Sequence, residues 1–206
     1  MKYKKIQNEV KASLKKSRFQ HTMGVVKTAV QLAEIYGCDR KKAKYAALLH
    51  DCAKHLPDPD KIEMCRKNNL PVSQAEMENP SLLHAKCGAI LARETYGIED
   101  EDILHAITVH TTGVPDMSFL DQIIFVADYI EPGRDSAPHL DELWKMALTD
   151  LDRTTWRILE DTVSYLSENH ASHMDPTTVA ACQFYREKYA ERRHTDHQDE
   201  ASVKSN

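Results

Sequence analysis

Glycine, proline and long apolar runs are all scarce in this sequence. Six glycines and eight prolines stand among its 206 residues, which is well under average usage. Alternating apolar and polar residues, the pattern of a half-buried strand, are nearly absent. The longest apolar runs, such as residues 45–49 and 123–127, fall far short of the roughly 20 residues that a bilayer-spanning helix needs. These absences exclude a membrane-spanning helix and predict an all-α fold.

Cysteine is limited to five residues, an odd number, and none is two or three positions from another: Cys38, Cys52, Cys65, Cys87 and Cys182. That spacing excludes a zinc site built from cysteines. It predicts free, buried thiols in a reducing compartment, the cytoplasm. Residues 1–18 are basic but contain no apolar segment, so we expect no secretory signal.

The charged residues are nearly balanced, with 27 basic and 32 acidic side chains and a formal net charge of −5. A bulk nucleic-acid binder needs an excess of Lys and Arg to face the phosphates, so we expect no nucleic-acid partner. A length of 206 residues predicts one domain. We place this domain at residues 1–192, followed by a polar tail over residues 193–206 that we expect to be disordered.

The spacing of apolar residues and the positions of capping residues predict a succession of helices. After a short basic N-terminal segment, we expect helices over residues 17–36, 60–68, 81–96, 100–110, 120–130, 141–169 and 176–192, with a break near residue 149. Ser17 is positioned to cap the first helix and Gly37 to end it. A further helix follows Asp39 as its cap and ends before Pro57. Residues 71–80 are expected to form a long loop.

Several side chains that can bind a metal fall on or beside the apolar faces of these helices. His110 extends the stripe formed by Ile103 and Ile107 at spacings of four and three residues. Asp128 stands four residues after Ile124 and therefore next to a buried face. A buried carboxylate without a partner costs on the order of several kcal/mol, so Asp128 needs a hydrogen-bonding or metal partner.

Other helices carry similar groups. His50 and Asp51 end an apolar helix, His21 lies one turn before an apolar stripe, and His84 stands among small residues. The full set is His21, His50, Asp51, His84, His110 and Asp128. A single histidine on an apolar face is most often a core residue, whereas five helices that each contribute such a group indicate a shared site. Imidazole and carboxylate without thiolate suit Fe, Mn, Zn or Co better than Ca.

The remaining histidines are expected to have no role in this site. His105 lies off the apolar stripe of its helix and is expected to face solvent. Those in polar segments are His139, His170, His173, His194 and His197. His55 lies beside Lys54, close to the candidate metal, and either role is open for it.

Five short blocks, in a fixed order, carry the candidate site. They are Ser17-Arg18-Phe19-Gln20-His21-Thr22, His50-Asp51-Cys52-Ala53-Lys54, Leu83-His84-Ala85, Val109-His110-Thr111-Thr112-Gly113 and Ala127-Asp128-Tyr129-Ile130-Glu131-Pro132-Gly133-Arg134. Together they resemble the YqeK family of the HD-domain superfamily of metal-dependent phosphohydrolases, over about residues 15–189. The resemblance implies a helical bundle with a metal site between its helices. It also implies symmetrical hydrolysis of diadenosine tetraphosphate (Ap4A) to two ADP.

The resemblance further implies a bound divalent transition metal, iron before Mn, Co or Zn. Its ligands would be His21, His50, Asp51 and Asp128, with positions left open for water and phosphate. A water activated by the metal would then attack phosphorus. Asp51 and Lys54 are expected to be catalytic, and Lys54 is placed one helical turn beyond His50.

Substrate contacts are expected from basic, imidazole and hydroxyl groups beside the ligands. They are Arg18, Lys54, His84, His110, Thr111 and Arg134, with a backbone donor from Gly113. The three basic residues would neutralise phosphate charge. His84 and His110 either complete a second metal site or contact phosphate directly.

Other functions fit the same residues. One is an HD phosphohydrolase acting on other nucleotides, of the mononucleotide or ppGpp type, although a ppGpp enzyme usually carries extra domains. Another is a catalytically silent sensor of nucleotide or metal, although such sensors usually lose ligands. A helical interaction protein is favoured only if the histidines are scattered in the fold. We expect no membrane partner, and a homodimer is a reasonable expectation for a small helical enzyme.

Overall fold

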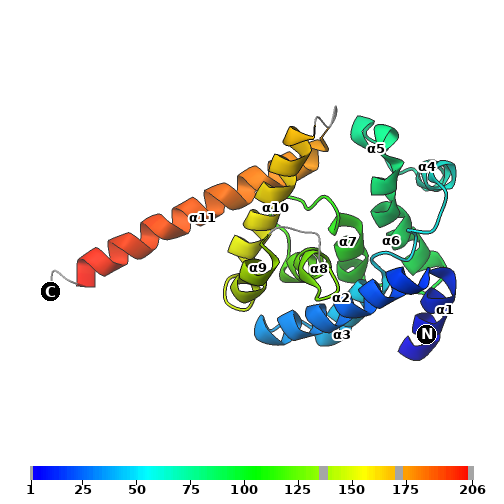
Figure 1. Ribbon diagram of the computed structural model, residues 1–206, viewed down its shortest axis with the longest axis horizontal. Helices are drawn as coiled ribbons and strands as arrows, with labels where there is room; N and C mark the ends of the chain where they lie inside the picture. Colours follow the sequence, from blue (N-terminus) through cyan, green and yellow to red (C-terminus); the bar gives the residue numbers. More distant parts are fainter. Residues whose placement is uncertain (1, 135–138, 170–173, 204–206) are drawn as a thin grey trace.

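The structure is a computed structural model that describes residues 2–134, 139–169 and 174–203, with side chains described as far as residue 192. Every regular element in these ranges is helical (Figure 1). In chain order they are α1 (Tyr3–Ser13), α2 (Lys16–Ile35), α3 (Arg40–Leu49), α4 (Asp58–Lys67), α5 (Gln74–Glu78), η1 (Pro80–Leu83), α6 (His84–Glu94), α7 (Glu101–Val109), α8 (Phe119–Ile130), α9 (Leu140–Ala147), α10 (Leu151–Glu168) and α11 (Pro176–Val203). The prediction of an all-α fold is confirmed. None of the described helices has the length and apolar character needed to cross a membrane.

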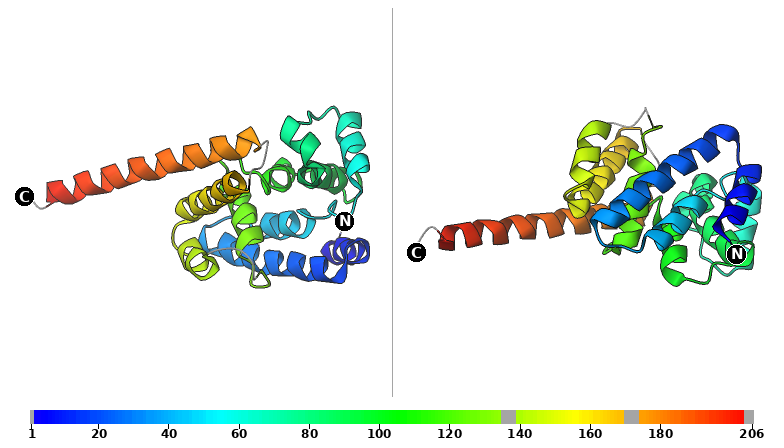
Figure 2. Two further views of the ribbon diagram at one scale, coloured as in Figure 1. Left: turned by 45° about the horizontal axis from the view of Figure 1, so that its top comes forward. Right: turned by 90° about the horizontal axis from the view of Figure 1, so that it is seen from below.

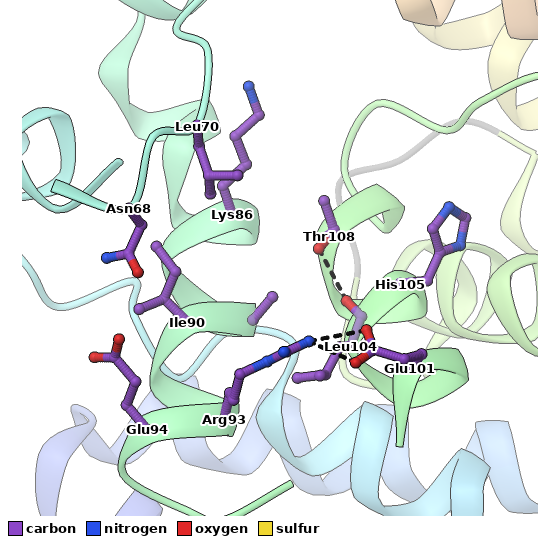
Figure 3. A pocket seen from close by; sticks show the side chains of 11 residues that line it. Asn68, Leu70, Lys86, Ile90, Arg93, Glu94, Glu101, Leu104, His105 and Thr108 are labelled. Atoms are coloured by element: carbon purple, nitrogen blue, oxygen red, sulfur yellow. Dashed lines mark hydrogen bonds and ion pairs between the residues drawn. The ribbon is translucent and has the colours of Figure 1, made fainter. Parts of the chain in front are cut away.

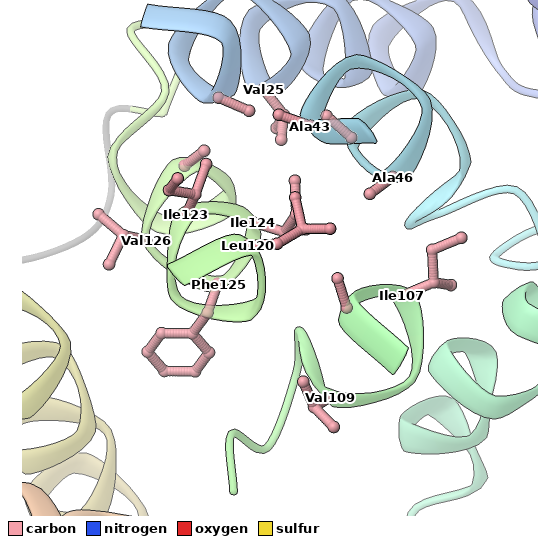
Figure 4. Close-up of a cluster of buried hydrophobic side chains, with 14 of the residues drawn as sticks. Val25, Ala43, Ala46, Ile107, Val109, Leu120, Ile123, Ile124, Phe125 and Val126 are labelled. Carbon is pink, nitrogen blue, oxygen red and sulfur yellow. The ribbon is translucent and has the colours of Figure 1, made fainter. Parts of the chain in front are cut away.

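The core is built around α8, which is buried on almost every side. Helices α2, α3, α7 and α10 pack against it. Figure 4 shows how Val25 of α2, Ala46 of α3 and Ile107 of α7 approach Ile124 of α8. The small side chains of α3 let it approach its neighbours closely. The C-terminal end of α8 therefore lies inside the protein.

The predicted helix ends agree with the structure at several positions. Asp39 caps α3, because its carboxylate accepts hydrogen bonds from two backbone N–H groups of the first turn. Gly37, which follows α2, has a φ of 65°, a left-handed conformation that costs glycine little. The expected break near residue 149 is confirmed, because α9 ends at Ala147 and α10 begins at Leu151.

Other local predictions are wrong. Ser17 lies inside α2, and the N-cap is Lys15, which makes no side-chain cap hydrogen bond. The expected loop over residues 71–80 contains α5, which is nucleated by a capping box between Ser73 and Glu76. The helix expected from residue 81 starts as the 3₁₀ turn η1, and regular α6 begins at His84.

Two predictions about helix ends also need correction. Helix α3 ends at Leu49 and the chain turns over residues 50–55, so Lys54 is not one helical turn beyond His50. Short turns, in which Lys54 N–H donates to the Asp51 carbonyl, replace the helical pattern. The last helix was expected to end at residue 192, whereas the backbone of α11 continues to Val203. Its C-terminal part extends away from the bundle (Figure 2).

Removal of the α3 cap should weaken the fold by a predictable amount. Asp39→Ala leaves the N–H groups of Lys41 and Lys42 without their acceptor, at 2.7 and 3.2 Å in the native protein. We expect a loss of about 1 kcal/mol in the free energy of unfolding. This corresponds to a melting temperature lower by about 2–4 °C for a protein of this size. Asp39→Asn is the control, since asparagine caps equally well, and equal losses in both variants would contradict the assignment.

Candidate metal centre

Five helices, and the residues that directly follow two of them, bring the six predicted metal-binding side chains together. They are His21 within α2, His50 and Asp51 after α3, His84 at the start of α6, His110 after α7, and Asp128 in the last turn of α8. Within the described residues their ligand atoms form three overlapping groups, in each of which all atoms lie within 4.8 Å of one another. The groups are His21-His50-Asp51, His50-His110-Asp128 and Asp51-His84-His110. The histidines therefore converge in the fold.

One oxygen of Asp51 faces the ligands from α2 and α3. Its Oδ2 atom lies 3.0 Å from Arg18 Nη1, 3.6 Å from His50 Nε2 and 4.0 Å from His21 Nε2. His50 and Asp51 are almost completely buried. A carboxylate in such a position needs cationic or hydrogen-bonding partners on each lone pair. Arg18 supplies one of them directly.

The other oxygen of Asp51 faces a second set of side chains. Its Oδ1 atom lies 3.2 Å from His84 Nε2, 3.7 Å from Lys54 Nζ and 3.9 Å from His110 Nε2. Lys54 thus reaches the cluster from the turn after α3, although it is not on the helix. Asp51 thus connects two halves of the site. The first half contains His21, His50 and Asp128, and the second half contains His84, His110 and Lys54.

Asp128 closes the first half of the site from the end of α8. Its Oδ1 atom lies 2.9 Å from His21 Nε2, 3.7 Å from His50 Nε2 and 3.3 Å from Arg134 Nη2. Arg134 follows the Pro132-Gly133 turn, as expected from the sequence. The cationic partner of Asp128 is therefore Arg134, and two imidazoles lie close to the same oxygen.

Backbone carbonyls fix the tautomers of the buried histidines. His50 Nδ1 lies 2.7 Å from the Ala47 carbonyl oxygen, and His110 Nδ1 lies 2.7 Å from that of Ile107. In each ring the Nδ1–H group donates to the carbonyl, so Nε2 presents its lone pair to the cluster. The Nε2 atoms of His21 and His50 are buried and make no hydrogen bond. Buried nitrogens left in this way, next to two carboxylates, fit a metal site.

Glu131 belongs to the site although no role was predicted for it. Its Oε1 atom lies 3.0 Å from His21 Nδ1 and accepts a hydrogen bond from that ring nitrogen. Glu131 is the C-cap residue of α8 and only 3% exposed. The only indication in the sequence was that Glu131 lies three residues after Asp128, in the same sequence block. Burial of this carboxylate became apparent only in the fold.

His84 and His110 face each other on the other side of Asp51, with 3.1 Å between their Nε2 atoms. Each Nδ1 contacts the backbone carbonyl three residues earlier, so each Nε2 carries a lone pair. Two lone pairs this close repel unless donors stand beside them. Lys54 Nζ lies 3.2 Å from His84 Nε2, and Thr111 Oγ1 lies 3.2 Å from both Nε2 atoms. An ammonium and a hydroxyl thus supply these donors.

The charges of the cluster keep its aspartates ionised. Burial raises the pKa of Asp51, but His50 and other basic neighbours outweigh it and hold that pKa well below its ordinary value. Burial likewise raises the pKa of Asp128, but His21 and His50 outweigh it, and the net shift is downward. Both carboxylates are therefore available as anionic ligands.

The second half of the site favours neutral imidazole. Burial, together with the nearby basic groups His50 and His84, lowers the pKa of His110 to about 3. His110 therefore stays uncharged near neutral pH. Burial also lowers the pKa of Lys54, which the nearby Asp51 opposes only in part.

Other sequence predictions about the site have mixed outcomes. His105 is exposed and lies 3.0 Å from Asp121, outside the cluster, so the prediction for it is confirmed. His55 and His139 are exposed. His170 and His173 lie outside the described residues, as do the side chains of His194 and His197. The predicted donor from Gly113 is wrong, because its N–H group already donates to the Val109 carbonyl.

Two cavities beside α7 contain none of the six side chains of the cluster. One, of about 540 Å³, lies between α6 and α7 and is crossed by the ion pair of Arg93 and Glu101 (Figure 3). The other, of about 330 Å³, has a mixed lining that includes Leu82 of η1, Val109 of α7 and Thr111. Since Thr111 contacts His84 and His110, this second cavity borders the site.

Comparison with known proteins agrees with this geometry. Residues 18–133 match the HD domain family. The chain is 45% identical over 171 residues to a Halalkalibacterium halodurans protein named symmetrical bis(5′-nucleosyl)-tetraphosphatase, covering 83% of this chain and 90% of the relative. A Bacillus subtilis protein of the same name is 42% identical over 161 residues, covering 78% and 86%.

A crystal structure shows the same fold. It is that of a predicted HD superfamily hydrolase involved in NAD metabolism from Clostridium acetobutylicum, with a TM-score of 0.87 and 39% sequence identity. The match covers 91% of this chain and 98% of the other. The family match, the close relatives and the helical bundle around six convergent side chains lead to one conclusion: this chain belongs to the HD-domain family, as a YqeK-type protein.

Proposed function

We propose that this protein hydrolyses Ap4A symmetrically to two ADP in a metal-dependent reaction. The observation that carries the proposal is the convergence of four histidines and two aspartates, with the buried Nε2 atoms of His21 and His50 left without hydrogen bonds. Relatives that align over most of their length are named for this activity. The alternatives of a silent sensor or a helical interaction protein have no comparable support.

The metal is proposed to bind between His21, His50, Asp51 and Asp128. These donors are two imidazoles and two carboxylates, which suit iron and also accept Mn, Co or Zn. Iron remains the metal that we propose. When bound there, a divalent metal polarises a phosphoryl oxygen and lowers the pKa of a water molecule.

The second half of the site is proposed to bind phosphate and not a second metal. Lys54 Nζ lies close to both Asp51 Oδ1 and His84 Nε2. Without this lysine, the charge of Asp51 Oδ1 would need a second cation at that position. The ammonium already neutralises this side of the carboxylate, and it would repel a divalent ion. His84, His110 and Thr111 then remain available to contact phosphate oxygens.

Three basic side chains surround the position where the tetraphosphate would lie. Arg18 and Arg134 are each anchored to one aspartate of the site, and Lys54 stands on the opposite side. A forked guanidinium binds phosphate oxygens in pairs. Their charges orient the chain of phosphates and offset the negative charge that spreads over the reacting phosphorus.

The reaction itself consumes one water molecule. Its oxygen forms a bond to one of the two central phosphorus atoms, and the bond from that phosphorus to the bridging oxygen breaks. The leaving ADP oxygen takes the electron pair, and the water proton passes to product or solvent. Each half of the substrate thus departs as ADP.

Location and assembly are further proposals. The five cysteines are free, and four of them are buried. Such thiols persist in a reducing compartment, so we propose that the protein acts in the cytoplasm. A homodimer remains a prediction that sedimentation of the purified chain can test.

Turnover of a small panel of nucleotides tests the proposed activity directly. Purified protein loaded with Fe²⁺ under reducing conditions is offered Ap4A, Ap3A, ppGpp, GDP and AMP. We expect ADP as the sole product from Ap4A, the fastest turnover on that compound, and loss of activity with a chelator. Release of ATP and AMP from Ap4A, or faster turnover of ppGpp, would contradict the proposal.

Substitutions in the two halves of the site should have different effects. His50→Ala removes a proposed metal ligand and should abolish both metal retention and hydrolysis. His84→Ala should keep one metal per chain while hydrolysis falls, because the phosphate contact is lost. Metal content and turnover, measured on the same samples, distinguish the two variants. His105→Ala is the control, and its metal content and turnover should equal those of the native protein. Loss of metal in His84→Ala would instead support a second metal site.

Lys54→Met should leave the metal in place and lower turnover by roughly 10²-fold or more, because the ammonium stabilises charge in the transition state. Methionine keeps much of the packing of the lysine stem. Lys67→Met is the matched control, because Lys67 is exposed on α4 and its ion pair among the described residues is with Glu63. The test is to measure kcat and KM for the native protein and both variants at equal metal content. An unchanged kcat/KM in Lys54→Met would remove Lys54 from the catalytic site.

A further inference from the structure

We propose that Glu131 is a positioning residue that fixes the tautomer and orientation of His21 for metal binding. The inference rests on the metal site proposed above, because it takes His21 Nε2 to be a ligand atom. The sequence pattern predicts no role for Glu131. The support is geometric: α2, the C-terminal end of α8 and the turn that follows α8 meet at the Glu131 carboxylate.

Both carboxylate oxygens of Glu131 act as hydrogen-bond acceptors. His21 Nδ1 lies 3.0 Å from Oε1, and the backbone N–H of Gly133 donates to Oε2 at 2.7 Å. The second bond holds the carboxylate in place while the first holds the imidazole ring. A proton on Nδ1 leaves Nε2 unprotonated, and Nε2 is the atom that faces Asp128.

Two glycines on separate elements leave the space that this carboxylate occupies. Gly24 lies in α2, three residues after His21, and a Cβ atom there would overlap Glu131 Oε2. The other close atoms are also in Glu131, with Cδ at 3.0 Å and Cβ at 3.5 Å. A Cβ atom on Gly133 would lie 3.0 Å from both oxygens. The present position of the carboxylate between α2 and the end of α8 therefore depends on the absence of a side chain at Gly24, and a side chain at Gly133 would crowd it.

The location of Glu131 is electrostatically unfavourable without a cation nearby. It follows the C-terminal end of α8, where the helix dipole is negative, and Asp128 stands three residues before it. Among the described residues, its only ion pair is with His21. A buried carboxylate paired only with an imidazole gives a net benefit when that imidazole binds a metal, because the carboxylate makes the ring a stronger ligand.

Only a carboxylate can make both bonds at once. In Glu131→Gln, one oxygen becomes an NH₂ group, which either faces the Gly133 N–H or faces His21 Nδ1. The first arrangement places two donors against each other. The second favours the His21 tautomer with its proton on Nε2, which cannot bind metal. Either outcome weakens the metal site while the side chain keeps its size.

The test measures metal affinity in the full-length chain, without reference to turnover. Metal-free protein is titrated with Co²⁺ in competition with a chelator, and the visible absorption of bound Co²⁺ reports its coordination. We expect Glu131→Gln to weaken Co²⁺ binding by roughly 10- to 100-fold and to alter the absorption bands. Glu76→Gln is the matched control. Glu76 is also buried and accepts a backbone hydrogen bond, but it pairs with Lys86 away from the site. Its Co²⁺ affinity should equal that of the native protein.

A double-mutant cycle separates positioning from the loss of charge. Gly24→Ala keeps the Glu131 charge but displaces its flexible end, so it should weaken Co²⁺ binding comparably, with the helix retained. In a Glu131→Ala background the same Gly24→Ala change should have no effect, because the overlapping atoms are gone. Native affinity in Glu131→Gln or in Gly24→Ala, or equal losses from Gly24→Ala in both backgrounds, would overturn the inference. A native protein that binds no Co²⁺ would overturn the proposed function itself.

Discussion

The buried carboxylate of Asp51 is the group on which the rest of this structure depends. Removal of a carboxylate from water is costly unless every lone pair finds a partner, and Asp51 is 2% exposed. Arg18 of α2 and Lys54 in the turn after α3 supply positive charge to it, and His84 of α6 and His110 after α7 lie beside its Oδ1 atom. Those elements must meet at one point for the charge to be tolerated. The convergence that stabilises Asp51 is also what assembles the candidate metal centre.

The helix ends give this centre its rigidity. His50 and His110 each stand directly after a helix, and their Nδ1 atoms are held by carbonyls of the last turn. Backbone groups that the helix leaves unpaired thus orient the rings, so that no further side chain is needed there. His21 lies inside α2, where the backbone carbonyls are already paired. Its orientation instead comes from Glu131, and two glycines make room for that carboxylate.

Much of the fold could be predicted from local signals, because capping and apolar spacing act over a few residues. Asp39 caps its helix and the break near residue 149 is present. The errors also arose locally. The capping box at Ser73 and Glu76 forms a short helix where a loop was expected. The turn that carries Lys54 toward the cluster depends on hydrogen bonds after Leu49 that no sequence periodicity reveals.

For the site, the sequence by itself determined the chemistry: imidazoles and carboxylates without thiolates, in an order that resembles the HD domain, on helices with apolar faces. Residue type and helical spacing are sufficient for that conclusion. The tertiary structure decided which atoms meet. It divided the neighbours of Asp51 between its two oxygens, placed Lys54 beside His84, and made Glu131 a partner of His21. The contacts of Lys54 with His84 and of Glu131 with His21 join residues 30 and 110 positions apart in the chain, so only long-range packing could decide them.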